Sequence, residues 1–403
     1  MLRDMAWLTP QRAKLYGSGM AIALAAIFAL FALIIYRRGG FDLSDNAIGP
    51  DFSSFWAASR QVLVGRSADV YVPRLHQLAE LPYSREYEAF FYPPTYLLIC
   101  LPLALAPFFV SYVAFVSTTA ALFTAIIWRI LKSPRSLVAV LSYPVTYMDI
   151  IGGQNGFLTA AILGCGLSII DRQPRLAGVV LGLMVIKPHL ALGAPIALVV
   201  TGRWRTLAWA GISSVGLVIL SYLLFGSDTW LGFLNISPAA RQTLENGDVN
   251  FGQQQSVFAM VRLLGAGVRT AWAVHGLGAL CAVFFLIWSL RQPISAAAER
   301  SIIVLACLLI TPFSLFYDML IVALPLAWML REWQSAGFPP WSKLVLCLVF
   351  LAPMVLYAPI IYNFTFVGPL PFGPAAILLF SWLLVREIAK TRRGGCKMRA
   401  SAA

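Results

Sequence analysis

Long apolar runs dominate the chain and restrict what it can fold into. Residues 19–36, 108–131, 207–225 and 271–290 carry almost no charge, and each is close to the roughly 20 residues that a helix needs to cross a bilayer. Hydrophobic residues make up 60% of the 403 positions, and charged residues only 12%. A soluble core does not hide that much apolar surface, so the sequence predicts an all-α integral membrane protein.

The positive charges indicate which side of the membrane each loop faces. The net charge is +13, but the arginines and lysines lie in short clusters between the apolar runs, as in cytoplasmic loops that follow the positive-inside rule. The charge therefore reports topology and does not indicate a nucleic-acid partner. The basic N-terminus and the basic tail, residues 386–403, place both termini in the cytoplasm. The runs between them predict about a dozen crossings within one transmembrane domain, residues 1–403.

Two long polar intervals interrupt the apolar runs, and the alternation of sides places both outside. In the first, residues 37–91, aromatic residues recur at helical spacing. This predicts an amphipathic helix on the membrane surface, beginning at Pro50-Asp51 and ending at Gly65. A second short helix is expected from Pro73 to Leu81. The second interval, residues 226–265, is interpreted as another large external loop.

Other apolar segments are too short or too broken for simple crossings. Prolines interrupt residues 92–131, which predicts a re-entrant piece over 95–105 and a crossing helix over 108–131. Between residues 137 and 200 each apolar stretch falls short of a full span, so these stretches predict broken or tilted helices that line a cavity.

The same alternation places a set of polar residues near helix ends on the external face. Polar groups at that depth are costly unless they line a wet cavity, so they are candidate site residues. They are Asp51, Tyr92, Gln154, Asn155, Lys187, His189, Gln255, Ser256, Tyr317 and Asp318.

Two charged residues of this set have competing interpretations. Asp51 follows a proline at a predicted helix start, so it is either a helix cap or a general base for an acceptor hydroxyl. Lys187 lies in an apolar run, where it either extends to the interface or, with His189, holds a phosphate. Arg262 is a further candidate phosphate ligand or an interfacial charge.

The remaining candidates also have simpler explanations. Asp318, next to Tyr317, opens an apolar segment and is a candidate helix cap. Gln255 and Ser256 suit sugar hydroxyls, although an external loop is polar in any case. The six cysteines are widely spaced, and the three histidines form no HxxxH pair. We therefore expect no metal site and no cofactor.

Short motifs spread from residue 51 to residue 318 resemble glycosyltransferase family 87, a group of polyprenyl-phosphate-dependent hexosyltransferases of the GT-C class. They are Asp-Phe-x-x-Phe-Trp with a later glycine (51–65), Asp-Val-Tyr (69–71), Tyr-Pro-Pro (92–94), Leu-Pro-Leu (101–103), Gly-Gln-Asn (153–155), Ala-Gly-x-x-Leu-Gly-Leu with Ile-Lys-Pro-His (177–189), Gln-Ser (255–256) and Thr-Pro-Phe-Ser (311–314).

The resemblance implies a GT-C-type helical bundle in the plasma (inner) membrane. It implies transfer of a hexose, such as mannose, from a polyprenyl-phosphate sugar donor to a lipid or glycan acceptor on the periplasmic or external face. Asp51 matches the acidic residue that GT-C enzymes place at the reaction centre. The family often has a histidine after its Ser-Pro or Thr-Pro motif, where this chain has Tyr317 and Asp318.

From these residues we expect inverting, metal-independent transfer, with Asp51 as the base and Lys187, His189 or Arg262 on the departing phosphate. A lipid-linked oligosaccharide polymerase or ligase, or a flippase, is the alternative function. A flippase needs functional groups toward both leaflets, whereas the candidate residues lie on one face. A ligase is distinguished by its use of diphosphate-linked donors.

Overall fold

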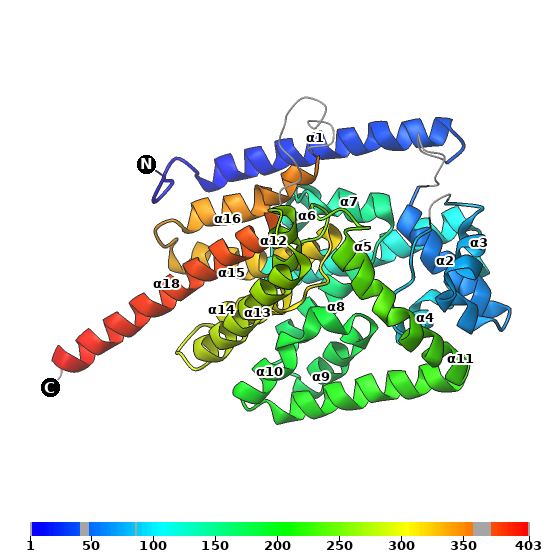
Figure 1. Ribbon diagram of the computed structural model, residues 1–403. Helices are drawn as coiled ribbons and strands as arrows, with labels where there is room; N and C mark the ends of the chain where they lie inside the picture. Colours follow the sequence, from blue (N-terminus) through cyan, green and yellow to red (C-terminus); the bar gives the residue numbers. More distant parts are fainter. Residues whose placement is uncertain (1, 41–47, 85–86, 358–371, 402–403) are drawn as a thin grey trace.

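Helices form the architecture of the computed structural model, which describes residues 2–40, 48–84, 87–357 and 372–401 (Figure 1). Within these residues no strand is present, and the one extended contact is an isolated antiparallel bridge between Gln254 and Leu315. The predicted all-α class is confirmed.

Among the described residues, five helices are long and apolar enough to cross a membrane. They are α1 (Pro10–Arg37), α5 (Phe108–Leu131), α11 (Trp204–Asn246), α13 (Val268–Leu290) and α18 (Phe372–Ser401). The structure therefore supports a membrane protein, but it does not confirm a dozen crossings. The predicted helix over residues 108–131 matches α5 at both ends.

The other elements are short, and many begin at a proline or glycine. They are α2 (Pro50–Leu63), η1 (Ser67–Tyr71), α3 (Pro73–Glu80), α4 (Pro94–Cys100), η2 (Leu103–Leu105), α6 (Ser136–Leu141), α7 (Val145–Gly152), α8 (Gly156–Ile169), α9 (Pro174–Gly182), η3 (Leu183–Ile186), η4 (Pro188–Ala191), α10 (Gly193–Val200), α12 (Val257–Leu263), α14 (Ala296–Ile310), η5 (Phe316–Val322), α15 (Ala323–Ala336), α16 (Ser342–Leu351) and η6 (Ala352–Tyr357). The broken helices predicted between residues 137 and 200 are confirmed.

The helix predicted over residues 50–65 matches α2, but protein covers the face that was expected to be polar and exposed. Every residue from Phe52 to Ser59 is buried, because α2 packs against α3, α4 and α5 inside the bundle. Its polar face tolerates burial since the side chains are small and bonded. The hydroxyl of Ser53 donates to the carbonyl of Pro50 at 2.6 Å, and that of Ser59 donates to Leu101 at 3.0 Å. Satisfied hydroxyls add little cost to a buried face.

The second polar interval is partly helical. α11 continues to Asn246 through a kink at Gly226, whose φ of +80° belongs to the left-handed region that glycine adopts readily. Ser67 of η1 binds at this kink, with its hydroxyl 3.2 Å from the carbonyl oxygen of Phe225 and 2.8 Å from the Thr229 hydroxyl. These two contacts connect α11, at its kink, to η1 in the first polar interval.

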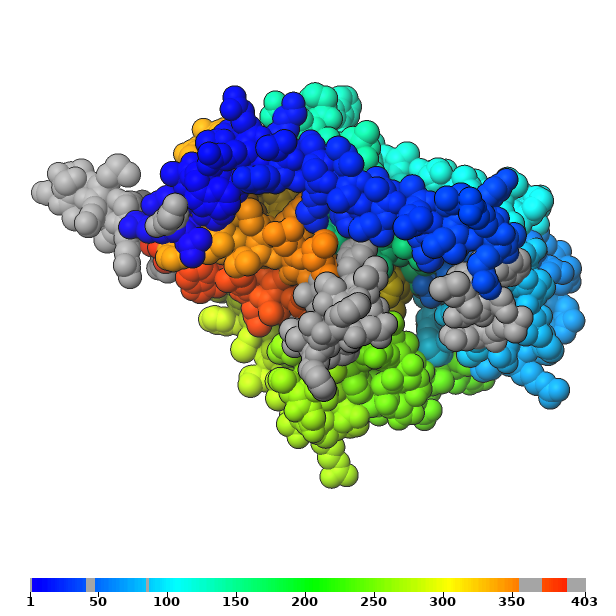
Figure 2. Space-filling model, turned by 90° about the horizontal axis from the view of Figure 1, so that it is seen from above, coloured from blue at the N-terminus to red at the C-terminus, as the bar shows by residue number. Residues whose placement is uncertain are grey.

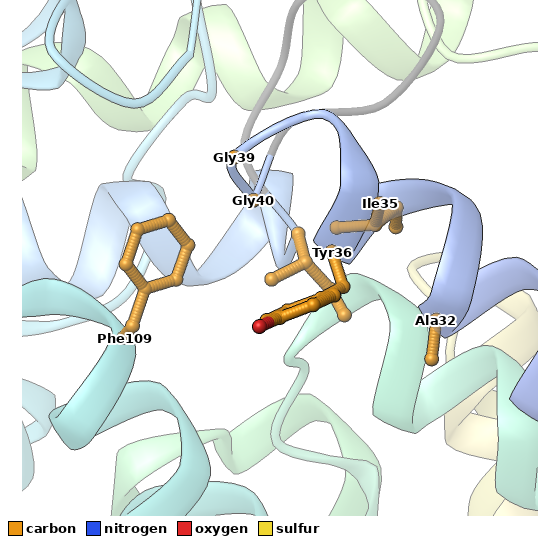
Figure 3. A pocket seen from close by; sticks show the side chains of 7 residues that line it. Ala32, Ile35, Tyr36, Gly39, Gly40 and Phe109 are labelled. Carbon is orange, nitrogen blue, oxygen red and sulfur yellow. The ribbon is translucent and has the colours of Figure 1, made fainter.

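α1 lies across the outside of the bundle (Figures 1 and 2). Of its residues only Ala21, Leu24 and Ile35 are buried, as expected for a helix that faces lipid. At its end, an apolar pocket of about 400 Å³ lies between α1 and α5, where Tyr36 and Phe109 face each other (Figure 3). None of the candidate site residues lines this pocket.

Candidate active site

A buried ion pair joins two candidate residues that are far apart in the sequence. Lys187 Nζ lies 2.6 Å from Asp318 Oδ1 and 3.2 Å from the side-chain oxygen of Asn155. Lys187 is 4% exposed and Asp318 1% exposed. Two charges buried this deeply are retained only when they are paired with good geometry. The structure thus favours a buried pair over a lysine that extends to the interface.

A break in the backbone places Lys187 in the interior. Proline disfavours the helical conformation at the residue before it. Lys187, which precedes Pro188, has φ −148° and ψ 66° and separates η3 from η4. The side chain therefore leaves the chain between two short helices instead of along a continuous one.

Asp318 is both a cap and an ion-pair partner. Its Oδ2 accepts the backbone N–H of Leu315 at 2.9 Å, which caps η5, while Oδ1 binds Lys187. The neighbouring Tyr317 is buried, and its ring centroid lies 4.5 Å from Lys187 Nζ. The ring of Tyr92 lies 5.8 Å from the same nitrogen. Two aromatic faces and one carboxylate thus surround the ammonium group.

Tyr92, Gln154 and Asn155 lie between Lys187 and Asp51. The hydroxyl of Tyr92 is 3.4 Å from Gln154 Oε1, and Gln154 is in turn hydrogen-bonded to Asp51. Asn155 binds Lys187 through its oxygen, while its buried amide nitrogen has no partner among the described residues. A buried donor without a partner is costly, so this nitrogen is available to a substrate oxygen.

Asp51 lies in the first turn of α2, but it is not the N-cap, because Gly49 holds that position. The N–H of Gly49 donates to the carbonyl of Ile151 at 3.0 Å, which brings the start of α2 to the end of α7. There Gly152 leaves room for the carboxylate, since a Cβ at that glycine would lie 2.8 Å from Asp51 Oδ2.

Burial raises the pKa of Asp51 to about 6, although hydrogen bonds from Gln154 and Glu88 and the charge of Lys187 act in the opposite direction. A carboxyl group with a pKa close to the ambient pH is suited to exchange protons with a substrate.

Asp149 completes the site and was missed from the sequence. It is fully buried, and its two oxygens accept the N–H groups of Gly156 and Phe157 at 3.0 and 3.2 Å. These bonds hold the turn that carries Gln154 and Asn155 at the start of α8. A lone acid in the apolar stretch before Gly152 is itself a signal of a functional or paired group.

Two candidates, Gln255 and Ser256, make contacts outside this network. Gln255 donates from its side chain to the carbonyl of Gly252 at 2.8 Å and accepts the N–H of Gly373 at 2.8 Å. Ser256 caps α12, with its hydroxyl oxygen 3.2 Å from the N–H of Ala259. These contacts support the loop, and direct binding of substrate by either residue stays a prediction.

Arg262 and His189 also stand apart from Asp51. Arg262 donates to the carbonyls of Ala266 and Glu245 at 2.8 and 3.3 Å. The ring of His189 lies 6.2 Å from that of Phe313, and His189 follows Lys187 by two residues along the chain. The phosphate-binding roles expected for these two residues stay predictions.

The family model for glycosyltransferase family 87 matches residues 90–312, more than half of the chain, and covers the elements that carry Tyr92, Gln154, Asn155 and Lys187. Searches of curated proteins and of solved structures found no match. The resemblance inferred from the short motifs is confirmed: the chain belongs to glycosyltransferase family 87 and is a membrane glycosyltransferase.

Proposed function

We propose that this enzyme transfers a hexose, such as mannose, from a polyprenyl-phosphate donor to a hydroxyl group of a lipid or glycan acceptor. One observation carries the proposal: the contacts Asp51–Gln154–Tyr92 and Asn155–Lys187–Asp318 gather a proton acceptor and a buried cation from segments spread over the chain. Transfer from a phosphate requires these two groups, a base for the acceptor and a positive charge for the leaving group.

In the proposed reaction the carboxylate of Asp51 takes the proton of the acceptor hydroxyl. The acceptor oxygen attacks the anomeric carbon, and the bond from that carbon to the phosphate oxygen breaks. A single displacement of this kind inverts the anomeric configuration. The bond electrons remain on the polyprenyl phosphate, which leaves with an additional negative charge.

Lys187 is proposed to stabilise that charge. An ammonium group has three N–H donors, and Asp318 and Asn155 occupy two of them. The third donor and the unpartnered amide nitrogen of Asn155 are available to phosphate oxygens. His189 and Arg262 are further candidates for the same phosphate.

The proposed location follows from the alternation of basic and non-basic loops. The enzyme crosses the plasma (inner) membrane several times, with both termini in the cytoplasm and the site of Asp51 toward the periplasm or exterior. Cysteine labelling of single-cysteine variants from each side of the membrane tests this orientation.

The direct test replaces Asp51 with asparagine, which keeps the size of the side chain and removes the base. We expect transfer from a polyprenyl-phosphate sugar to fall by about 10²–10⁴-fold, the usual contribution of a general base, with donor binding retained. Asp228→Asn, at an exposed acid of α11, is the matched control. Full activity of the Asp51→Asn variant contradicts the assigned role, and preference for a diphosphate-linked donor favours the ligase alternative.

A further inference from the structure

A second buried polar cluster ties α3 to α2. His76 and Glu80, one turn apart in α3, are both 0% exposed, and Glu80 Oε1 lies 3.4 Å from His76 Nε2. The Nδ1 atom of His76 lies 2.8 Å from Gln61 Oε1, and its Nε2 lies 3.0 Å from Ser54 Oγ. Gln61 and Ser54 belong to α2, the helix that begins next to Asp51.

The hydrogen-bond partners in this cluster leave one oxygen of Glu80 without a donor. The side-chain N–H of Gln61 donates to the carbonyl of Leu75 at 3.4 Å, so the side-chain oxygen of Gln61 faces His76. An amide oxygen only accepts, and Nδ1 therefore carries the ring proton. Nε2 is then an acceptor, and the Ser54 hydroxyl at 3.0 Å is its donor. Glu80 Oε1 lies 3.4 Å from Nε2 and is buried with no hydrogen-bond partner among the described residues. A buried carboxylate oxygen without a donor is unfavourable, which favours the protonated carboxyl group.

The surroundings also favour a protonated Glu80 at neutral pH. Burial raises the pKa of Glu80 to about 8 and lowers the pKa of His76 to about 3. The other titratable groups that face Glu80 are Glu88, Tyr87 and Asp51, and the negative charge on the hydrogen-bonded pair of Glu88 and Asp51 also disfavours a second carboxylate. On η1, which also contacts α3, the charged Asp69 is paired with Arg66 at 2.6 Å.

Glu80 also binds the segment that leads into the active site. Its Oε2 accepts the backbone N–H of Glu88 at 3.2 Å. The side chain of Glu88 is hydrogen-bonded to Asp51. Four residues later, Tyr92 reaches Gln154 and stacks on Tyr96 with 4.4 Å between ring centroids. Glu80 therefore lies between the helix that carries Asp51 and the segment that carries Tyr92.

We propose that Glu80 is a positioning residue for Asp51 and Tyr92: as a neutral carboxylic acid beside His76, it holds α2 and the segment 87–92 together. This inference rests on the proposed function, because it takes Asp51 as the base. When Glu80 loses its proton at alkaline pH, a buried carboxylate faces the lone pair of His76 Nε2. The segment then separates from α2, and sugar transfer declines.

The test compares Glu80→Gln with Glu80→Ala in the full-length enzyme across neutral and alkaline pH. The side chain of glutamine has the size of a neutral glutamic acid, accepts the N–H of Glu88 and does not titrate. We expect near-wild-type transfer by Glu80→Gln at neutral pH and activity that extends to higher pH than in the wild type. Glu80→Ala should be impaired at every pH, and the control Asp228→Asn should leave the wild-type profile unchanged.

A second measurement does not depend on sugar transfer. The infrared difference between wild type and Glu80→Gln should show the carbonyl band of a buried protonated carboxyl at neutral pH, and the band should disappear at alkaline pH. Absence of this band overturns the inference even if transfer is robust. So does a Glu80→Gln variant that is as inactive as Glu80→Ala or that shares the alkaline limb of the wild type. If the wild type transfers nothing from polyprenyl phosphates, the proposed function fails, while the band still reports the protonation of Glu80.

Discussion

Replacing Lys187 with methionine removes a buried cation at nearly constant side-chain volume. In the wild type the ammonium nitrogen lies 2.6 Å from Asp318 Oδ1. In the variant the carboxylate of Asp318 keeps one donor, the N–H of Leu315 at 2.9 Å, and loses its counter-charge. Removing one partner of a buried ion pair costs about 3–5 kcal/mol. We expect the free energy of unfolding to fall by that amount and sugar transfer to be lost.

A second substitution separates the structural role of Lys187 from its role in transfer. Adding Asp318→Asn to Lys187→Met removes the uncompensated charge, while the amide oxygen still accepts the N–H of Leu315. The double variant should regain most of the lost stability. Transfer should nevertheless remain about 10²–10³-fold below wild type, the usual effect of removing one donor that stabilises charge in the transition state.

The assay combines denaturant unfolding in detergent micelles with single-turnover transfer from a polyprenyl-phosphate sugar. Arg241→Met is the control, because it breaks an ion pair with Glu245 in which the arginine side chain is 64% exposed, and such pairs contribute about 0–1 kcal/mol. Recovery of both stability and transfer in the double variant refutes the proposed contact with phosphate and leaves Lys187 as a partner of Asp318 alone. An unchanged stability of the single variant refutes the assigned cost of the buried charge.

Two further predictions concern Asp51 and the buried pair of α3. In Gly152→Ala the new Cβ lies 2.8 Å from Asp51 Oδ2, so the carboxylate must move, and we expect transfer to fall by about 10²-fold while Gly216→Ala, with no atom within 4 Å, keeps full activity. For pH, folding raises the pKa of Glu80 from 4.5 to about 8 and lowers that of His76 from 6.5 to about 3. Between pH 4.5 and 6.5 the unfolded chain has lost the Glu80 proton but holds one on His76. The folded chain holds the Glu80 proton and none on His76, so both states bind the same number of protons. The stability contribution of the pair should be flat there and decline toward pH 8 and toward pH 3, by up to about 1.4 kcal/mol per pH unit. Parallel unfolding free energies of wild type and Glu80→Gln from pH 5 to 9 would contradict this.

The sequence predicts which residues belong to the site better than it predicts which of them contact one another. Lys187 and Asp318 were identified because charged residues in apolar runs are costly, and this argument needs no tertiary information. Their pairing joins residues 131 positions apart, and the alternation of loop sides gives only the face of the membrane. Gln154 and Asn155 were selected for the same reason as Lys187, and their contacts with Tyr92 and Lys187 emerged from packing.

Other contacts depend on backbone groups that need partners. The buried carbonyl of Gly252 and the N–H of Gly373 engage the side chain of Gln255, and its contact with sugar hydroxyls stays a prediction. The periodicity predicted where α2 lies along the chain, but not that its polar face is buried. Small hydroxyl side chains such as Ser59 can be buried when a carbonyl oxygen accepts their hydrogen bond. The pairing of His76 with Glu80 has helical spacing, but its burial is visible only in the fold.

The separation of Lys187 from Asp318 has a consequence for the order of biosynthesis. A ribosome that adds about 5–20 residues per second makes the partner carboxylate 131 residues later, an interval of about 7–26 s. During that time Lys187 lacks its ion-pair partner, while two acids that also act on its charge, Asp51 and Asp149, are already made. Asn155, made 32 residues earlier, is a partner already present. The ammonium group of Lys187 is therefore expected to bind the side-chain oxygen of Asn155 first and the carboxylate of Asp318 later.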